Sequence, residues 1–309
     1  MLLKRMRALC AVLASAMGAL GFTLTSSALA AQPEDWRLGF QDSVTPLGDE
    51  IHSFHNLLLI IITVITLFVM VLLAWVMIRY REKRNPVPSK TTHNTVVEVL
   101  WTVVPILILA LIAIPSFRLL YKVDRAPADQ ACLDQRKKDR TVKCEPKVDL
   151  TIKAKGLQWY WAYEYPDNGN FQFESRLVCR SAKECADKAK DFGGKVPLRL
   201  LDVDNQVVVP VGANVRVIVI GMDVIHAWTV PAFGVKVDAN PGRANEVWFR
   251  ALKEGTYYGQ CSELCGADHA FMPIAVKVVS QDAFKAWLEE ANKKFDKVEK
   301  PRAEVKPAK

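Results

Sequence analysis

The segment CSELCGADHAFM, residues 261–272, holds two cysteines, a histidine and a methionine. A further histidine, His226, lies upstream in the segment DVIHAW. The chain has five histidines, and only His226 and His269 come after residue 93. Thiolate, imidazole and thioether together form a ligand set suited to copper, whereas zinc gains nothing from a methionine. The sequence therefore predicts a copper site built from Cys261, Cys265, His269, Met272 and His226.

The number of metal ions depends on the second cysteine. A mononuclear electron-transfer copper site uses one cysteine, two histidines and a weak axial methionine. With both Cys261 and Cys265 available, two thiolates can bridge two copper ions, each of which takes one terminal histidine. Such a site shares one electron over two metals and changes little in geometry on reduction, which suits electron transfer. A disulfide between these two cysteines is the alternative.

Four of the remaining cysteines fall into two charged segments that interrupt the pattern of short strands. Cys132 and Cys144 lie in the insert at 124–147, and Cys179 and Cys185 lie in the insert at 176–195. In an oxidising compartment we expect each pair to form a local disulfide. Metal binding is less favoured because neither insert contains a histidine. The sequence does not assign a role to either insert.

Residues 1–31 have the three-part layout of a secretory signal peptide. A basic start is followed by an apolar stretch at 8–24 and by the small residues SSALAA. We expect cleavage near Ala30 or Ala31, with Cys10 absent from the mature protein. A transmembrane anchor is the alternative for this segment.

Two longer apolar segments, at about 57–78 and 99–117, are each long enough for the ~20 residues that a membrane-spanning helix needs. The loop between them, RYREKRNPVPSK, is strongly basic and therefore predicted to face the cytoplasm. Pro105 and Pro115 are expected to kink the second helix without ending it. The predicted order is outside, helix, inside, helix, outside, with residues 32–120 forming the N-terminal segment and hairpin.

The region 121–292 is predicted to be an extracytoplasmic β domain. Its short runs of valine, isoleucine and aromatic residues are separated by glycine, proline, asparagine and aspartate, which indicates an antiparallel sandwich or barrel. The stretch QDAFKAWLEEANKKF places its apolar residues on one helical face and predicts a short C-terminal helix. Residues 293–309 are rich in lysine, proline and glutamate and are expected to form a disordered basic tail.

The chain resembles subunit II of cytochrome c oxidase. The residues that carry the resemblance are YYGQCSELCGADHAFMPI, DVIHAWTVPAFGVKVDANPGR, QWYWAYEY and VVEVLWTVVPILILALIAIPSFRLLY, which cover most of 50–280. The resemblance implies a membrane-anchored α+β protein with a two-helix transmembrane hairpin. After the hairpin, the resemblance implies an extracytoplasmic Greek-key β-barrel of cupredoxin type and a short C-terminal helix. The resemblance also implies a location in the bacterial inner membrane, with the large domain on the periplasmic side. The charged inserts and the tail depart from the family pattern.

The resemblance also implies a role for each residue of the copper loop. Cys261 and Cys265 are bridging thiolates, His226 and His269 are terminal ligands, Met272 is a weak ligand and Glu263 binds through its backbone carbonyl. The Glu263 carboxylate is further implied to reach a magnesium ion at the boundary with subunit I, and a surface glutamate is the alternative.

Other residues are implied to serve electron and proton transfer. Trp159 corresponds to the electron entry point from cytochrome c, with core packing as the alternative, whereas for Trp161 core packing is the favoured interpretation. Glu98 corresponds to the entrance of a proton channel, with a solvated interfacial acid as the alternative.

A local acidic patch is predicted to steer a basic redox partner to the protein. The stretch GLQWYWAYEYPDNGNFQFES has Glu164, Asp167 and Glu174 without a lysine or arginine, although the net charge of the chain is +8. Asp223 resembles a further docking carboxylate of the family. Glu164, Asp167 and Asp223 are therefore the predicted docking residues.

The function implied is that of the electron-entry subunit of a proton-translocating oxidoreductase. It accepts electrons from cytochrome c at the dinuclear copper and passes them to haem in subunit I, which reduces oxygen to water. Subunits I and III and the lipid bilayer are the expected partners, and nucleic acid is not. The main alternative is a Sco-like copper delivery protein or thiol oxidoreductase, although that class has one anchor and lacks the methionine.

Two other copper or oxidase proteins are weaker alternatives. Nitrous oxide reductase carries a similar loop, but it is soluble and needs a second metal domain. A quinol oxidase subunit has the fold without the ligands. His52, His55 and His93 flank the apolar segments and are expected to be interfacial.

Overall fold

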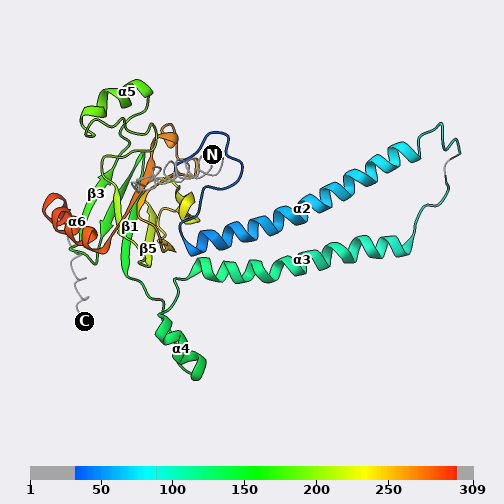
Figure 1. Ribbon diagram of the computed structural model, residues 1–309, viewed down its shortest axis with the longest axis horizontal. Helices are drawn as coiled ribbons and strands as arrows, with labels where there is room; N and C mark the ends of the chain where they lie inside the picture. Colours follow the sequence, from blue (N-terminus) through cyan, green and yellow to red (C-terminus); the bar gives the residue numbers. More distant parts are fainter. Residues whose placement is uncertain (1–31, 88, 298–309) are drawn as a thin grey trace, which may run out of the picture.

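The computed structural model describes residues 32–87 and 89–297 and consists of a helical hairpin followed by a β-sandwich (Figure 1). The predicted signal peptide, with Cys10, lies outside the described residues, as does 298–309 of the predicted tail. The predicted fold class is confirmed: two apolar helices precede a β domain that carries a short helix near its C-terminal end.

The hairpin is formed by α2 (Pro46–Arg79) and α3 (Thr95–Asp124). Both helices are long and apolar enough to cross a membrane by length and composition. They extend beyond the apolar segments predicted at 57–78 and 99–117 because capped polar turns continue them. The Thr45 side chain accepts a hydrogen bond from Gly48 N, and Asn94 accepts from Val96 N and Val97 N. Both prolines inside α3 are accommodated without ending the helix.

The β domain is a sandwich of two sheets. The strands are β1 (Leu150–Leu157), β2 (Tyr160–Tyr165), β3 (Phe171–Ser175), β4 (Val207–Pro210), β5 (Val215–Gly221), β6 (His226–Val230), β7 (Val235–Ala239), β8 (Asn245–Phe249), β9 (Gly255–Cys261), β10 (Pro273–Val279) and β11 (Asp296–Lys297). One sheet has the order β11-β3-β2-β1-β5-β8 and the other the order β4-β10-β9-β6-β7. Most strand pairs are antiparallel, as expected, but β1 pairs with β5 and β4 with β10 in parallel.

The core lies between the sheets. Along β1 and β5, buried and half-buried residues alternate, as expected when one face of a strand packs inward. Trp161 is fully buried there. The buried Tyr163 accepts a hydrogen bond from the indole NH of Trp228 at 3.2 Å, which ties the two sheets together.

Helix α6 (Gln281–Lys294) packs on the sandwich at its C-terminal end. Trp287 lies against Tyr165 with 5.2 Å between the ring centroids. After α6, the short strand β11 pairs with β3. The tail predicted to begin at 293 therefore starts too early, since residues up to Lys297 belong to regular elements.

The hairpin is fixed to the sandwich by hydrogen bonds from both helices. The Thr45 hydroxyl, at the start of α2, donates to Phe233 O at 2.7 Å, and Val44 N donates to Ala232 O at 3.0 Å. The indole NH of Trp248 on β8 donates to Lys122 O, in the last turn of α3, at 2.9 Å. These contacts fix the orientation of the β domain relative to the helical hairpin.

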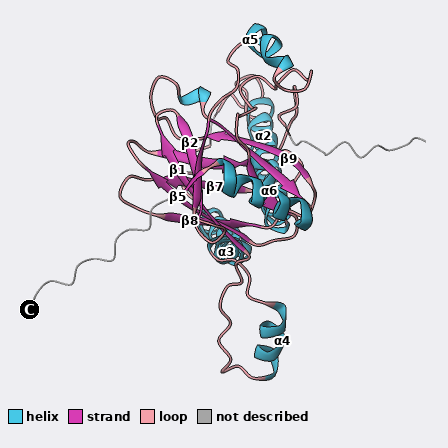
Figure 2. Cartoon of the chain, turned by 90° about the vertical axis from the view of Figure 1, so that its left-hand side faces the viewer, coloured by secondary structure: helices cyan, strands magenta, loops and turns pink. Residues whose placement is uncertain are grey.

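The two charged inserts form small lobes on opposite ends of the β domain, one carrying α4 (Gln130–Lys138) and the other α5 (Ala182–Asp187) (Figure 2). Disulfides join Cys132 to Cys144 and Cys179 to Cys185, which are the pairs named from the sequence. The α4 lobe lies beside the end of α3.

The structure corrects one predicted docking residue, Glu164. Its side chain is 5% exposed, and its two carboxylate oxygens lie 2.7 Å from Lys153 Nζ and 2.9 Å from Lys155 Nζ. Burial opposes ionisation of Glu164, but the hydrogen bonds from these lysines hold the pKa of the carboxyl below its ordinary value. The charge of the Glu164 carboxylate is thus balanced by two lysines within the β1–β2 pair, so it is not available to attract a partner protein.

Replacing Glu164 with glutamine should lower the free energy of unfolding by about 1–3 kcal/mol at neutral pH, because both lysines lose their counter-charge. Since the folded pKa is below the ordinary value of 4.5, this contribution is present above pH 4.5 and is lost as pH falls through the folded pKa. Thermal unfolding of both proteins at neutral and acidic pH measures the difference. A gap in stability that stays constant into the acid range would contradict this assignment.

Candidate metal centre

Three side chains and one carbonyl surround Cys261 and Cys265, the two free cysteines among the residues that the structure describes. The two Sγ atoms are 3.9 Å apart, far beyond the ~2.05 Å of a disulfide, and both side chains are buried. Ligand atoms of His226, Cys261 and Cys265 all lie within 4.8 Å of one another. Cys261 and Cys265 therefore do not form the alternative disulfide in this structure.

Each sulfur has its own set of neighbours. Cys261 Sγ lies 3.9 Å from His226 Nδ1 and 3.3 Å from the carbonyl oxygen of Glu263. Cys265 Sγ lies 3.5 Å from His269 Nδ1 and 3.5 Å from Met272 Sδ. All six predicted ligand positions are thus brought together, with one histidine beside each sulfur. This arrangement fits a pair of soft metal ions bridged by two thiolates.

The strands of the second sheet deliver these donors to one end of the sandwich. His226 opens β6 and Cys261 closes β9, and the two strands pair with Trp228 opposite Cys261. Cys265 lies in the loop after β9, and His269 opens the short helix η3 (His269–Phe271). A hydrogen bond from Cys261 N to Met272 O at 3.3 Å closes the loop. The buried sheet therefore fixes both ends of the loop.

Asp223 orients the buried ligand His226. Its Oδ1 lies 2.8 Å from His226 Nε2, and its Oδ2 accepts from Gln158 N at 2.7 Å. With Nε2 donating to this carboxylate, Nδ1 is the nitrogen that faces Cys261, and in the neutral ring its lone pair would be available to a metal. Asp223, predicted as a docking residue, is thus also the carboxylate partner of a ligand histidine.

The protonation of the two thiols favours a cationic occupant. Burial raises the pKa of Cys261, but hydrogen bonds from His226, from the backbone at Glu263 and Ala227 and from His269 together outweigh it, so the pKa is lowered. Burial and the neighbouring Cys261 charge raise the pKa of Cys265. Two thiolates at this separation therefore need positive charge between them, which bound metal ions supply.

Trp159 lies directly beside the candidate centre. Its indole NH donates to Cys265 O at 3.2 Å, and Gln158 Nε2 donates to the same oxygen at 2.8 Å. The ring is half-buried, with Gly266 packed close against it. One hydrogen bond thus joins a partly exposed aromatic ring to the peptide of a cysteine ligand.

The predicted patch of Glu164, Asp167 and Glu174 does not form a group of free acids beside Trp159, since Glu174 is ion-paired with Arg176 at 2.8 Å. Glu164 is buried between two lysines, as described above. Asp167 is exposed, but it follows the far end of β2, whereas Trp159 precedes the start of that strand. Six strand residues separate them, or about 20 Å at ~3.3 Å per residue. Of the three predicted docking acids, only Asp223 is brought close to Trp159.

Glu263 and Glu98 occupy different settings. Glu263 is exposed in the loop between Cys261 and Cys265. Glu98 is half-buried in the first turn of α3, where its Oε1 accepts from Asn94 N at 3.2 Å. This contact gives Glu98 a capping role at the helix start.

Sequence reasoning missed Gly156 on β1. A Cβ at this position would lie 2.8 Å from His226 Cδ2, so only glycine leaves room for the imidazole. The ring of His226 also meets Trp161 edge-on at 6.0 Å between centroids. A glycine next to the QWYW stretch is visible in the sequence, but its contact with His226 arises from sheet packing and has no local signal.

The family comparisons agree with this site. A family model described as "Cytochrome C oxidase subunit II, periplasmic domain" matches residues 150–279, and one for the transmembrane domain matches residues 33–119. "Probable cytochrome c oxidase subunit 2" of Rickettsia felis is 45% identical over 87% of this chain and 76% of its own length. "Cytochrome c oxidase subunit 2" of Cereibacter sphaeroides is 42% identical over 89% of this chain and 90% of its own length.

A solved structure was also found. The crystal structure of the periplasmic domain of subunit II of cytochrome oxidase of Bradyrhizobium japonicum is 58% identical in sequence. It covers 49% of this chain and 99% of its own, with a TM-score of 0.43.

Gly156→Ala should displace His226 and weaken metal binding by about tenfold, the lower end of the effect seen when ligand support is disturbed. Titration of the purified protein with copper, followed by its absorption spectrum, measures the affinity. Thr151→Ala on the other face of β1 is the control. Equal copper affinity in the two variants would show that His226 tolerates the added methyl group.

Proposed function

The chain belongs to the cytochrome c oxidase subunit II family, and from that premise we propose that it carries a dinuclear copper centre that receives electrons from cytochrome c. The observation that supports the centre most strongly is the convergence of two reduced, buried cysteines with one histidine each. The residues that would hold the metal pair are His226, Cys261, Glu263 through its carbonyl, Cys265, His269 and Met272.

When bound, the copper pair would take up one electron at a time and pass it to haem in subunit I, where oxygen is reduced to water with proton translocation. The chain's own residues keep the site ready for this exchange. Burial of both sulfurs excludes water, and Asp223 holds His226 in one tautomer. Because β6 and β9 fix the ligands before any electron arrives, little rearrangement accompanies the change of charge.

Trp159 is the proposed entry point for electrons. The half-buried ring touches Gly266 and is hydrogen-bonded to Cys265 O, so it is the aromatic group between solvent and a bridging cysteine. Asp223, on the same side through its bond to Gln158 N, is the remaining candidate for docking a basic cytochrome c. Exposed apolar side chains at Met222, Ile225 and Leu264 surround this end of the domain.

The hairpin anchors the domain to a membrane. We place the protein in a bacterial inner membrane with the β domain on the periplasmic side, which follows from the basic loop after α2. The apolar outer faces of α2 and α3 are available to lipid and to subunits I and III. Glu98, at the cytoplasmic start of α3, is the proposed entrance of a proton channel. The Glu263 carboxylate is the proposed contact to magnesium.

A Sco-like delivery protein has no observation in its favour. The described residues include two helices of membrane-spanning length, and a methionine packs against the second cysteine. Both features fit an electron-transfer centre better than a site that must release its metal.

Cys265→Ser should reduce the copper content from two ions per chain to one or none. The substitution removes the sulfur atom that would bridge the two ions and that lies beside both His269 and Met272. Metal analysis of the membrane-bound variant, with the amount of inserted protein as the reference, measures this. Two coppers per chain in the variant would refute the bridging role.

Trp159→Ala should slow electron transfer from reduced cytochrome c far more than it changes the affinity for cytochrome c, because the ring is part of the route and not of the docking surface. Stopped-flow reduction kinetics and binding titrations separate the two effects. Tyr160→Phe, at the adjacent position, is the matched control. Kinetics equal to those of the control would remove Trp159 from the route.

A further inference from the structure

The insert between β3 and β4 reaches the loop that carries two of the candidate ligands. This insert contains α5, the disulfide Cys179–Cys185 and, between the two cysteines in sequence, Arg180. Its guanidinium leaves the insert and contacts the segment after Cys265. No role was assigned to this insert from the sequence.

Arg180 makes a two-point contact with Asp268 and a third contact with Phe271. Its Nη2 lies 2.8 Å from Asp268 Oδ2 and its Nη1 lies 3.3 Å from Asp268 Oδ1. Its Cζ lies 4.6 Å from the centre of the Phe271 ring. A planar guanidinium can make both contacts at once, whereas a lysine ammonium cannot reproduce the fork.

The two contacted residues flank a predicted copper ligand. Asp268 directly precedes His269, and Phe271 closes the same helical turn, in which Phe271 N donates to Asp268 O at 2.9 Å. His269 Nδ1 lies 3.5 Å from Cys265 Sγ, and Met272 follows the turn. Fixing Asp268 and Phe271 therefore limits the movement of the backbone that presents His269 and Met272.

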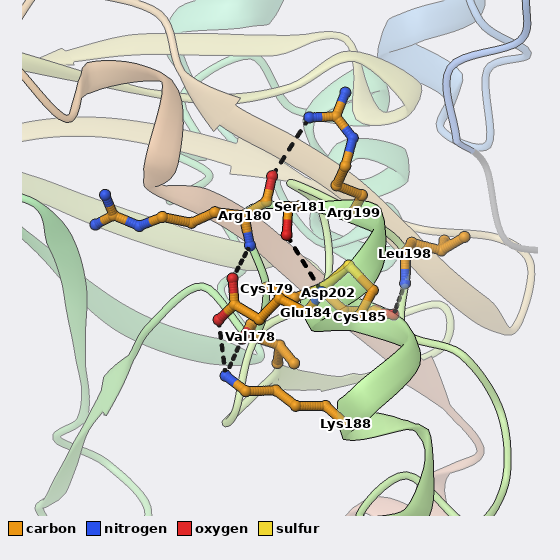
Figure 3. The surroundings of a disulfide bond; sticks show 10 residues. All are labelled: Val178, Cys179, Arg180, Ser181, Glu184, Cys185, Lys188, Leu198, Arg199 and Asp202. Carbon is orange, nitrogen blue, oxygen red and sulfur yellow. Dashed lines mark hydrogen bonds and ion pairs between the residues drawn. A yellow bond between two sulfur atoms is a disulfide. The ribbon is translucent and has the colours of Figure 1, made fainter.

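Arg180 is itself held firmly in the insert. Its N donates to Glu184 Oε2 at 2.8 Å, and its O accepts from Arg199 Nη1 at 3.5 Å. The adjacent disulfide is buried. Figure 3 shows the backbone of Arg180 held from both sides while its guanidinium points away from the disulfide. The Arg180 side chain is 56% exposed, but its backbone is held on both sides, which limits the positions from which the guanidinium can reach Asp268.

We propose that Arg180 is a positioning residue for the metal centre, through which the disulfide-closed insert holds the His269 turn in place. The inference rests on the proposed function, because it assigns a role toward the copper ligands. An isolated surface ion pair contributes little. Arg180 differs from such a pair in its two-point contact with Asp268, its contact with Phe271 and its hydrogen-bonded backbone. These contacts restrain a turn whose position would decide the geometry of the metal site.

The test compares wild-type protein, Arg180→Ala, Arg180→Lys and Lys183→Ala as full-length membrane-bound proteins. Lys183 is exposed on α5 and serves as the charge-matched control. The readouts are the rate of copper release to a chelator and the copper hyperfine pattern in electron paramagnetic resonance. Arg180→Ala should release copper about tenfold faster than wild type and alter the hyperfine pattern. Arg180→Lys should be intermediate, and Lys183→Ala should match wild type.

Combining Arg180→Ala with Asp268→Asn checks that the effect runs through this pair. The double variant should release copper no faster than the faster single variant, since both remove the same contact. If Arg180→Ala matches Lys183→Ala in release rate and spectrum, the inference is overturned. If wild type and Lys183→Ala themselves hold fewer than two coppers, the proposed function fails instead.

Discussion

Two buried sulfur atoms that must lie close together without bonding to each other are the constraint on which the rest of this structure depends. Cys261 and Cys265 are held 3.9 Å apart because one ends a paired strand and the other lies in a loop closed by backbone hydrogen bonds. In this structure the two sulfurs are therefore close but unbonded. The sheet also aims the two histidines and the methionine at the sulfurs from separate elements.

Two thiolates placed close together in a buried site repel each other, and the groups around Cys261 and Cys265 reduce this repulsion. One thiolate is stabilised by His226, and that imidazole is held in turn by Asp223. A second thiolate beside the first is unfavourable until cations arrive. The absence of a side chain at Gly156 leaves room for the imidazole, and Trp159 covers the peptide of Cys265. Hydrogen bonds between the hairpin and the sandwich fix the orientation of the β domain relative to the two helices.

Features that depend on local pattern could be predicted from the sequence. The ligand spacing, the two apolar helices and the strand-rich domain each leave a signal within one segment of chain. Features that depend on packing between segments could not. Glu164 looks like a free acid until β1 places Lys153 and Lys155 beside it, and Asp167 looks close to Trp159 until β2 separates them. The contacts of Gly156 with His226 and of Arg180 with Asp268 likewise join residues far apart in sequence. The parallel strand pairs arise from sheet order, which residue alternation does not encode.

The central claim is that Cys261 and Cys265 remain reduced and share two copper ions in the mature protein. Electron paramagnetic resonance of the oxidised, copper-replete wild-type protein, combined with mass-spectrometric mapping of its cysteines, tests this most directly. The account predicts a hyperfine pattern from one electron shared equally by two copper nuclei, with no bond between the two sulfurs. A pattern from a single copper nucleus, or a Cys261–Cys265 disulfide in the metal-loaded protein, would contradict it.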